Sequence, residues 1–420
     1  MQTEMYTEGK MTMKPIISRF FRYISIDTQG DDQASCCPSN ENQRLLADLL
    51  CEELKEFGVT DVRVDENSFL YAKISSNLDT PVPSVAFLAH LDTNPWVIGE
   101  HIHPRIVREY DGGDIILNQR KNLVLSPSRY PELLSHVGED LIVTDGTTLL
   151  GADGKAGITE IMEAVRYVTE HPELKHGDLY IVFTPDEELG YSTDYINLKE
   201  IPADFGFTVE GGGLGEINIE NFNAATATVT IHGHGIHPGV ARNTMKNAVL
   251  LAHKFISCFP ESEMPENTDS YEGYYHVSDI RGDVSQCIMT YHIRDFSAAR
   301  YEERKKLLAK TASYLNLHYG AGTFEVQIDD YYLNMKRKID DHPEILETAK
   351  RAVTMAGITP KLVPVRGGTD GAVISFDGFP CPNIFSGEQN GFSVFEYISA
   401  QTMEKAVEVI INIIRLCKDL

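Results

Sequence analysis

The sequence predicts an α/β protein with a mixed central sheet flanked by helices, interrupted by an inserted α+β domain. Three observations support this prediction. Short apolar runs of strand length alternate with amphipathic helical stretches before residue 220 and again near the end of the chain. Between residues 221 and 330 the pattern changes to apolar–polar alternation, which is typical of half-buried strands. The chain has 420 residues, which exceeds the length that a single hydrophobic core usually supports, so two domains are expected.

The first elements follow from periodicity. The first dozen residues are polar and are expected to be irregular. A helix is predicted over 14–23, where apolar residues recur at helical spacing, and a second helix begins after Ser39 and ends at Gly58. Short strands are predicted over 61–64, 69–74 and 85–90.

The middle of the first half is less regular. Turn residues interrupt the stretch 94–144, and a hairpin-like approach is predicted over 137–150. An amphipathic helix follows Gly157, and strands are predicted over 179–184 and 205–209.

Residues 221–330 are predicted to have the element order β-α-β-α-β. They are predicted to contain strands over 225–231, 286–293 and 324–328 and helices over 245–259 and 301–315. Helices over 344–356 and 401–417 and strands over 361–365 and 383–385 then resume the first pattern. We therefore predict one discontinuous domain, 1–220 with 331–420, and an inserted domain, 221–330.

Polar residues follow four strand or loop segments of the first domain. They are His90 and Asp92, Asp153, Glu187 and Glu188, and Glu210. Strand ends in open α/β sheets are where such folds keep their chemistry. An isolated acidic pair is more often a solvated surface feature, but four such junctions in one α/β pattern favour a site.

These residue types suit a hydrolytic dinuclear zinc centre. Such a centre needs imidazole and carboxylate ligands on separate rigid elements, one carboxylate that bridges two ions, and a free carboxylate that takes a proton from water. The side chains of the adjacent pair Glu187 and Glu188 must diverge, so one can bind metal while the other acts as general base.

Composition narrows the function classes. The formal charge of −25 disfavours nucleic-acid and anionic-membrane partners. No apolar run is long enough to cross a bilayer, and the N-terminus lacks a signal-peptide core. The seven cysteines are odd in number and show no CxxC spacing, which suits reduced thiols. We expect a soluble cytoplasmic enzyme.

Seven motifs together resemble the peptidase T family of tripeptide aminopeptidases, part of the dinuclear-zinc group that also holds aminoacylases and related carboxypeptidases. The motifs are Ala89–Thr93, Asp145–Asp153, Thr184–Glu188, Glu220–Ala224, His237–Gly239, Ile293–Phe296 and Arg366–Gly371. This resemblance covers nearly the whole chain and implies a metallopeptidase catalytic domain, with the insertion serving as a lid or dimerisation domain.

The resemblance also implies residue roles. His90 and Glu210 would bind the first zinc ion, Glu188 the second, and Asp153 would bridge them. Asp92 would hold the His90 imidazole, and Glu187 would be the general base. His237 would steady the oxyanion, while Arg294 and Arg366 would anchor the peptide carboxylate. Two zinc ions per chain, a short peptide substrate and a possible homodimer are implied in the same way.

Three positions depart from the family pattern. Glu210 and Gly154 each stand where the family has Asp. Phe392 stands where the family has its last metal-ligand His, four residues before Glu396, and no His follows His342. The second ion would then keep Asp153 and Glu188 unless Glu388, Glu396 or water contributes.

This departure leaves two alternatives to a tripeptide aminopeptidase. The first is a degenerate relative that holds one or no metal and binds peptides without efficient catalysis. The second is an amidase or aminoacylase that acts on another N-acyl amino compound, as relatives of the family do.

Overall fold

A computed structural model describes residues 14–420, and the irregular start predicted for the first dozen residues lies outside this range. Its contacts divide the chain into two compact units. The first unit holds the described residues up to Ile217, His342–Leu362 and Gly378–Leu420, and the second holds Asn218–Asp341 and Val363–Asp377. We predicted that one domain is catalytic and that the other serves as a lid or dimerisation domain, and this assignment stays a prediction.

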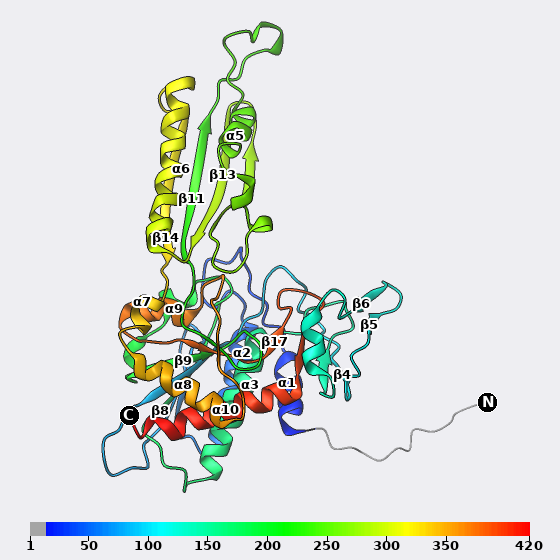
Figure 1. The fold of residues 1–420 in the computed structure, drawn as a ribbon, viewed down its shortest axis with the longest axis vertical. Coiled ribbons are helices and arrows are strands. Elements are labelled where there is room, and N and C mark those ends of the chain that lie inside the picture. Colours follow the sequence, from blue (N-terminus) through cyan, green and yellow to red (C-terminus); the bar gives the residue numbers. More distant parts are fainter. Residues whose placement is uncertain (1–13) are drawn as a thin grey trace, which may run out of the picture. The chain divides into compact units, whose positions relative to one another are not determined.

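An eight-stranded mixed sheet forms the centre of the first unit (Figure 1). Its order is β1 (Asp61–Val64), β2 (Leu70–Ile74), β8 (Leu179–Thr184), β3 (Val85–His90), β9 (Phe205–Val209), β16 (Asn383–Ile384), β10 (Glu216–Asn218) and β15 (Lys361–Leu362). The strands β8, β3 and β9 run parallel and are buried along their whole length, whereas β1 and β2 pair antiparallel at one edge. The predicted fold class is confirmed.

Helices cover this sheet. They are α1 (Pro15–Ile24), α2 (Asn42–Glu56), α3 (Ala152–Glu170), the short α4 (Ser192–Tyr195), α8 (Pro343–Met355) and α10 (Ala400–Cys417). The helix α3 packs against β3, α1 and α10. It lies directly on the end of β9, because a β-carbon at Gly157 would sit 1.9 Å from the carbonyl oxygen of Val209. No helix in the described part of the chain combines the length and apolar composition that spanning a bilayer requires.

A smaller second sheet of the first unit pairs segments that lie far apart in the sequence. Its order is β17 (Glu388–Gln389), β18 (Tyr397–Ser399), β7 (Leu141–Val143) and β4 (Arg105–Val107), and β5 (Ile115–Asn118) pairs separately with β6 (Leu123–Leu125). The hairpin-like approach predicted over 137–150 is wrong, because β7 finds its partners in β4 and β18. Short 3-10 turns lie at Pro131–His136 and Leu198–Glu200.

The second unit is an antiparallel sheet with a long and a short helix packed on it (Figure 1). Its strands are β12 (Tyr274–Gly282), β13 (Gln286–Asp295), β11 (Asn223–His232) and β14 (Phe324–Tyr332), and α5 (Ala248–Ile256) and α6 (Ala298–Tyr319) pack on it to form one apolar core. The shorter elements are α7 (Lys336–Ile339), α9 (Asp370–Ile374) and 3-10 turns at Pro238–Val240, Glu261–Glu263, Pro265–Asn267 and Ser375–Asp377. The sequence patterns missed β12, since it is an edge strand that exposes most of its residues.

Candidate metal centre

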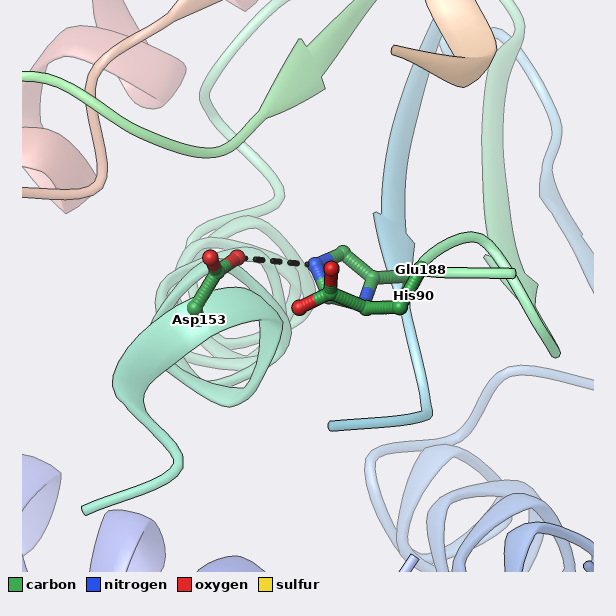
Figure 2. Close-up of side chains that lie close together, drawn as sticks. All are labelled: His90, Asp153 and Glu188. Atoms are coloured by element: carbon green, nitrogen blue, oxygen red, sulfur yellow. Dashed lines mark hydrogen bonds and ion pairs between the residues drawn. The ribbon is translucent and has the colours of Figure 1, made fainter. Parts of the chain in front are cut away.

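Three predicted metal ligands meet at the C-terminal edge of the central sheet. His90 is the last residue of β3, Asp153 lies in the first turn of α3, and Glu188 follows β8. One ligand atom from each lies within 4.8 Å of the other two. Figure 2 shows the His90 ring facing the Asp153 carboxylate, with Nε2 3.0 Å from Oδ1 and the Glu188 carboxylate beside it.

Glycines bring Asp153 to His90. Gly151 precedes α3 with a φ of 76°, a left-handed conformation that suits glycine, and Asp153 itself has a non-helical ψ of 114°. At Gly154 a β-carbon would lie 2.4 Å from Cδ2 of His90. The absence of a side chain at this position therefore lets the imidazole approach the start of α3 closely.

Asp92 supports His90 and the glutamate pair at once. Its side chain is fully buried, and its Oδ1 lies 3.3 Å from Nδ1 of His90. The same carboxylate accepts the backbone N–H groups of Glu187 at 3.1 Å and Glu188 at 3.0 Å. Because both N–H groups point at one carboxylate, the two glutamate side chains leave this turn in fixed directions.

A buried aspartate that the sequence patterns missed holds the same turn. Asp186 has a φ of 55° and is fully buried. Its carboxylate accepts the backbone N–H of Ser39 at 2.6 Å and the amide of Gln43 at 2.7 Å. These contacts hold Asp186 in its left-handed conformation. The sequence did not indicate them, because Ser39 has the pattern of a helix start and not of a hydrogen-bond donor to Asp186.

Glu396 and Glu388 have different tasks. Glu396 is 1% exposed and accepts four backbone N–H groups, those of Leu150, Gly151, Ala152 and Asp153, at 2.6–3.2 Å. It is therefore committed to the N-terminus of α3 and is not available to a metal. Glu388 lies in β17 and accepts a hydrogen bond from the Ser386 hydroxyl.

Phe392 leaves the expected histidine position without a ligand. Its side chain is 44% exposed, with a φ of 61°. The ring centroid lies 6.1 Å from that of Trp96, which is 73% exposed. Its neighbour Gly391 borders the site, since a β-carbon there would lie 3.3 Å from Oδ2 of Asp153.

Three predicted residues belong to the second unit. His237 is exposed, and its Nδ1 accepts the backbone N–H of Gly239 at 3.1 Å. This contact makes Nε2 the protonated nitrogen of the neutral ring, as a donor to an oxyanion requires. Arg294 donates to the carbonyl oxygens of Ala225 and Ile293.

Arg366 has a structural task in the same unit. Its guanidinium donates to the carbonyl oxygens of Thr268, Ser270 and Glu272 and lies over the ring of Phe222. These contacts tie the loop before β12 to the segment 363–377. A role in anchoring a substrate carboxylate stays a prediction for both arginines.

Comparison with known proteins identifies the family. A family model described as Peptidase family M20/M25/M40 matches residues 145–416. The chain belongs to this peptidase family. Proteins named Peptidase T from Clostridium acetobutylicum and Caldanaerobacter subterraneus are each 46% identical to it over 404 residues, covering 96% of this chain and 99% of theirs. The predicted family is thus confirmed.

Solved structures of M20 family proteins share the fold. The aminopeptidase PepT from Bacillus cereus superposes with a TM-score of 0.74 at 23% identity, covering 97% of this chain and all of its own. A dinuclear metal-binding M20 peptidase from Bacillus subtilis superposes with a TM-score of 0.64 at 13% identity, with coverages of 97% and 99%. At these identities the likeness concerns the fold alone.

Within the cluster of His90, Asp153 and Glu188, the pKa values of Glu188 and His90 are both raised. Burial, followed by the charge of Asp153, raises the pKa of Glu188 well above its usual range. Burial lowers the pKa of His90, but its hydrogen bonds to Asp153 and Asp92 more than offset this, so the net shift is upward. Both ring nitrogens face oxygen acceptors, the carbonyl oxygen of Asp92 at Nδ1 and the carboxylate of Asp153 at Nε2, which favours a protonated ring when no metal is bound.

The donor set fits a metal ion. Oxygen Oε1 of Glu188 is buried and makes no hydrogen bond within the described residues, which is costly unless a cation or proton satisfies it. Imidazole and carboxylate ligands on a strand end, a helix start and a turn are the types and supports that a catalytic zinc or related ion uses. His90, Asp153 and Glu188 would hold it.

We expect metal binding to release protons, because the ion must displace the Nε2 proton of His90 and any proton held by Glu188. With pKa values raised, these groups keep their protons in the metal-free protein, so the apparent affinity for zinc should rise as pH increases from about 6 to 8. Isothermal titration calorimetry in buffers of different ionisation enthalpy counts the protons. About two protons released per ion at pH 7 are expected, one from each group. A pH-independent affinity would contradict this picture of the site.

Proposed function

We propose that the chain is a metal-dependent aminopeptidase that removes the N-terminal residue from tripeptides. The cluster of His90, Asp153 and Glu188 within 4.8 Å carries this proposal, because it offers a metal ion both imidazole and carboxylate ligands at one sheet edge. The 46% identity to proteins named Peptidase T over nearly full length supports the substrate class.

Zinc is the proposed metal, with Glu210 as a fourth ligand residue. Glu210 follows β9, and its backbone N–H donates to the Ile384 carbonyl at 3.1 Å, which ties it to β16. When bound, zinc supplies Lewis acidity toward the peptide carbonyl and toward water.

Glu187 is the proposed general base. Its backbone N–H is held by Asp92, and its half-buried side chain leaves the same turn as that of the proposed ligand Glu188. It would take the proton from the attacking water and return it to the leaving amine. His237 is the proposed donor to the oxyanion, through Nε2.

A substrate panel separates this function from an amidase or aminoacylase. Tripeptides present a free α-amine and a peptide bond, whereas N-acyl amino acids lack the amine. We expect kcat/KM for tripeptides to exceed that for N-acyl amino acids by about 10²-fold or more, because a site built for a polar group rejects analogues that leave its partners unpaired. A preference for N-acyl amino acids would favour the acylase. Absence of turnover with zinc bound would favour a peptide-binding relative.

A further inference from the structure

Two exposed aromatic side chains lie together in the first unit. Trp96, the single tryptophan of the chain, and Phe392 come from distant parts of the sequence, and their ring centroids are 6.1 Å apart with an angle of 38° between the rings. Isolated apolar groups on a surface are ordinary, whereas large aromatic rings that stay exposed side by side are typical of binding sites.

Phe392 is next to the metal centre through the residue that precedes it. A β-carbon at Gly391 would lie 3.3 Å from Oδ2 of Asp153. Adjacent Cα atoms are about 3.8 Å apart, so the backbone of Phe392 is one residue away from the cluster that holds Asp153. Its ring is partly exposed, which leaves it accessible to a molecule bound at the cluster.

The turn that presents Phe392 has an unfavourable backbone conformation. Its φ of 61° is left-handed, which glycine adopts freely and a residue with a large side chain does not. The Ser393 hydroxyl donates to the carbonyl oxygen of Asn390 at 2.8 Å, and the N–H of Phe395 donates to the Ser393 hydroxyl at 3.1 Å, so the turn is held locally. Strain of this kind is concentrated at functional sites. Glycine would suit this backbone better, so the contribution of Phe392 is its ring.

The loop that presents Trp96 also begins at the metal centre, because Asp92 lies four residues before it. The side-chain amide of Gln29 donates to carbonyl oxygens on both sides of Trp96, those of Asn94 at 2.9 Å and Val97 at 2.7 Å. The N–H of Trp96 donates to Oδ1 of Asn94 at 2.9 Å. These backbone contacts fix the loop, so its conformation does not require the exposed indole ring.

The order of bonds in a peptide decides which side chain lies nearest these rings. An aminopeptidase cleaves at the carbonyl of the N-terminal residue, and the side chain of that residue begins two bonds from the carbonyl carbon. With this carbonyl at the cluster, the N-terminal side chain starts closest to it. Large apolar and aromatic side chains gain most from covering the rings, because the contact removes apolar surface of both partners from water.

We propose that Trp96 and Phe392 form the subsite for the side chain of the N-terminal residue of the peptide, and that this subsite selects large apolar and aromatic side chains. The inference rests on the proposed function for taking a peptide as the ligand. It gives Phe392 a task in substrate selection, at the position where the family resemblance implies a metal ligand.

A comparison of two tripeptides tests the subsite. We expect the zinc-loaded chain to have a kcat/KM for phenylalanyl-glycyl-glycine about tenfold or more above that for alanyl-glycyl-glycine, because the larger side chain buries more apolar surface. This ratio should fall to about one in Trp96→Ala and in Phe392→Gly. Glycine accepts the φ of 61°, so Phe392→Gly removes the ring without straining the turn. An unchanged ratio in either variant would overturn the proposal.

Two further variants control the comparison. Tyr314→Ala removes an exposed aromatic ring from α6 in the second unit and should keep the ratio of the unmodified chain. Trp96→Phe keeps an aromatic face and should restore most of the ratio that Trp96→Ala loses.

The pattern of the loss separates this subsite from other roles of the two rings. Rings that held the α-ammonium group by cation–π contact would affect both peptides equally, so the ratio would persist and the proposal would fail. Rings that contacted the second residue would instead change the preference between alanyl-phenylalanyl-glycine and alanyl-glycyl-glycine. A change confined to those two peptides would also refute the proposal.

Trp96 itself reports binding without turnover, because the tryptophan fluorescence of the full chain comes from this residue alone. The amino acid L-phenylalanine, a product of the first peptide, should shift the emission of the zinc-loaded chain to shorter wavelength in a saturable way. L-alanine at the same concentrations should not, and Phe392→Gly should weaken the binding of L-phenylalanine about tenfold. Emission that L-phenylalanine leaves unchanged would overturn the proposal.

The two measurements also distinguish failure of this inference from failure of the proposed function. A saturable shift with L-phenylalanine in a chain that hydrolyses no tripeptide would sink the proposed function and leave the aromatic subsite standing. Hydrolysis of both tripeptides with the same ratio in the unmodified chain, Trp96→Ala and Phe392→Gly would do the reverse.

Discussion

Replacing Glu187 by glutamine is expected to lower kcat for tripeptide hydrolysis by about 10²–10⁴-fold, the usual contribution of a general base. The amide keeps the size of the side chain but cannot accept a proton from water. Asp92 holds this turn through backbone N–H groups, so the substitution leaves the positions of Glu188 and His90 intact. Zinc content should therefore stay unchanged. The measurements are steady-state kinetics and metal analysis of the same preparation.

The neighbouring residue provides the control for this experiment. Glu188→Gln removes a proposed ligand, so it should reduce metal content as well as activity. The proton acceptor would be misassigned if Glu187→Gln turned over tripeptides at the unmodified rate. A loss of zinc in Glu187→Gln would instead make Glu187 a ligand.

Replacing Glu396 by alanine is expected to destabilise the protein by about 1–3 kcal/mol or more, the cost of leaving a buried hydrogen-bond donor without its acceptor. The substitution leaves four backbone N–H groups from Leu150 to Asp153 without their acceptor at the start of α3. Because one of these groups belongs to Asp153, metal affinity should fall as well. Thermal unfolding of the metal-free protein and zinc titration measure the two effects.

Glu404→Ala is the matched control for that variant. Glu404 lies on α10 with 44% of its side chain exposed and pairs with Lys14, and exposed ion pairs contribute about 0–1 kcal/mol. Its loss should leave the melting temperature nearly unchanged. Equal melting temperatures for Glu396→Ala and Glu404→Ala would show that the N-terminus of α3 does not depend on Glu396.

Hydrophobic patterns in the sequence predicted the strands whose ends carry the residues of the candidate metal centre. The bounds of β1, β8 and β9 agree with the predicted ranges, and His90 at the end of β3 meets Glu188 after β8 as expected. Hydrophobic periodicity reports which face of a segment is buried, so it locates a strand and the residue that ends it. It predicted neither the edge strand β12, which is mostly exposed, nor the partners of β7.

Local periodicity and short motifs were enough to predict the α/β class, the family and the residues of the imidazole–carboxylate cluster. The surroundings of the buried glutamates depend on packing between distant segments, so they could not be predicted in this way. Glu396 reaches N–H groups more than 240 residues away in the chain, and α3, which carries the buried Glu160, packs beside β17, which carries Glu388. Three glutamates look alike in a sequence. Their surroundings differ, because packing places four N–H groups around Glu396 and the Ser386 hydroxyl beside Glu388, whereas the Glu160 carboxylate has no hydrogen-bond partner among the described residues.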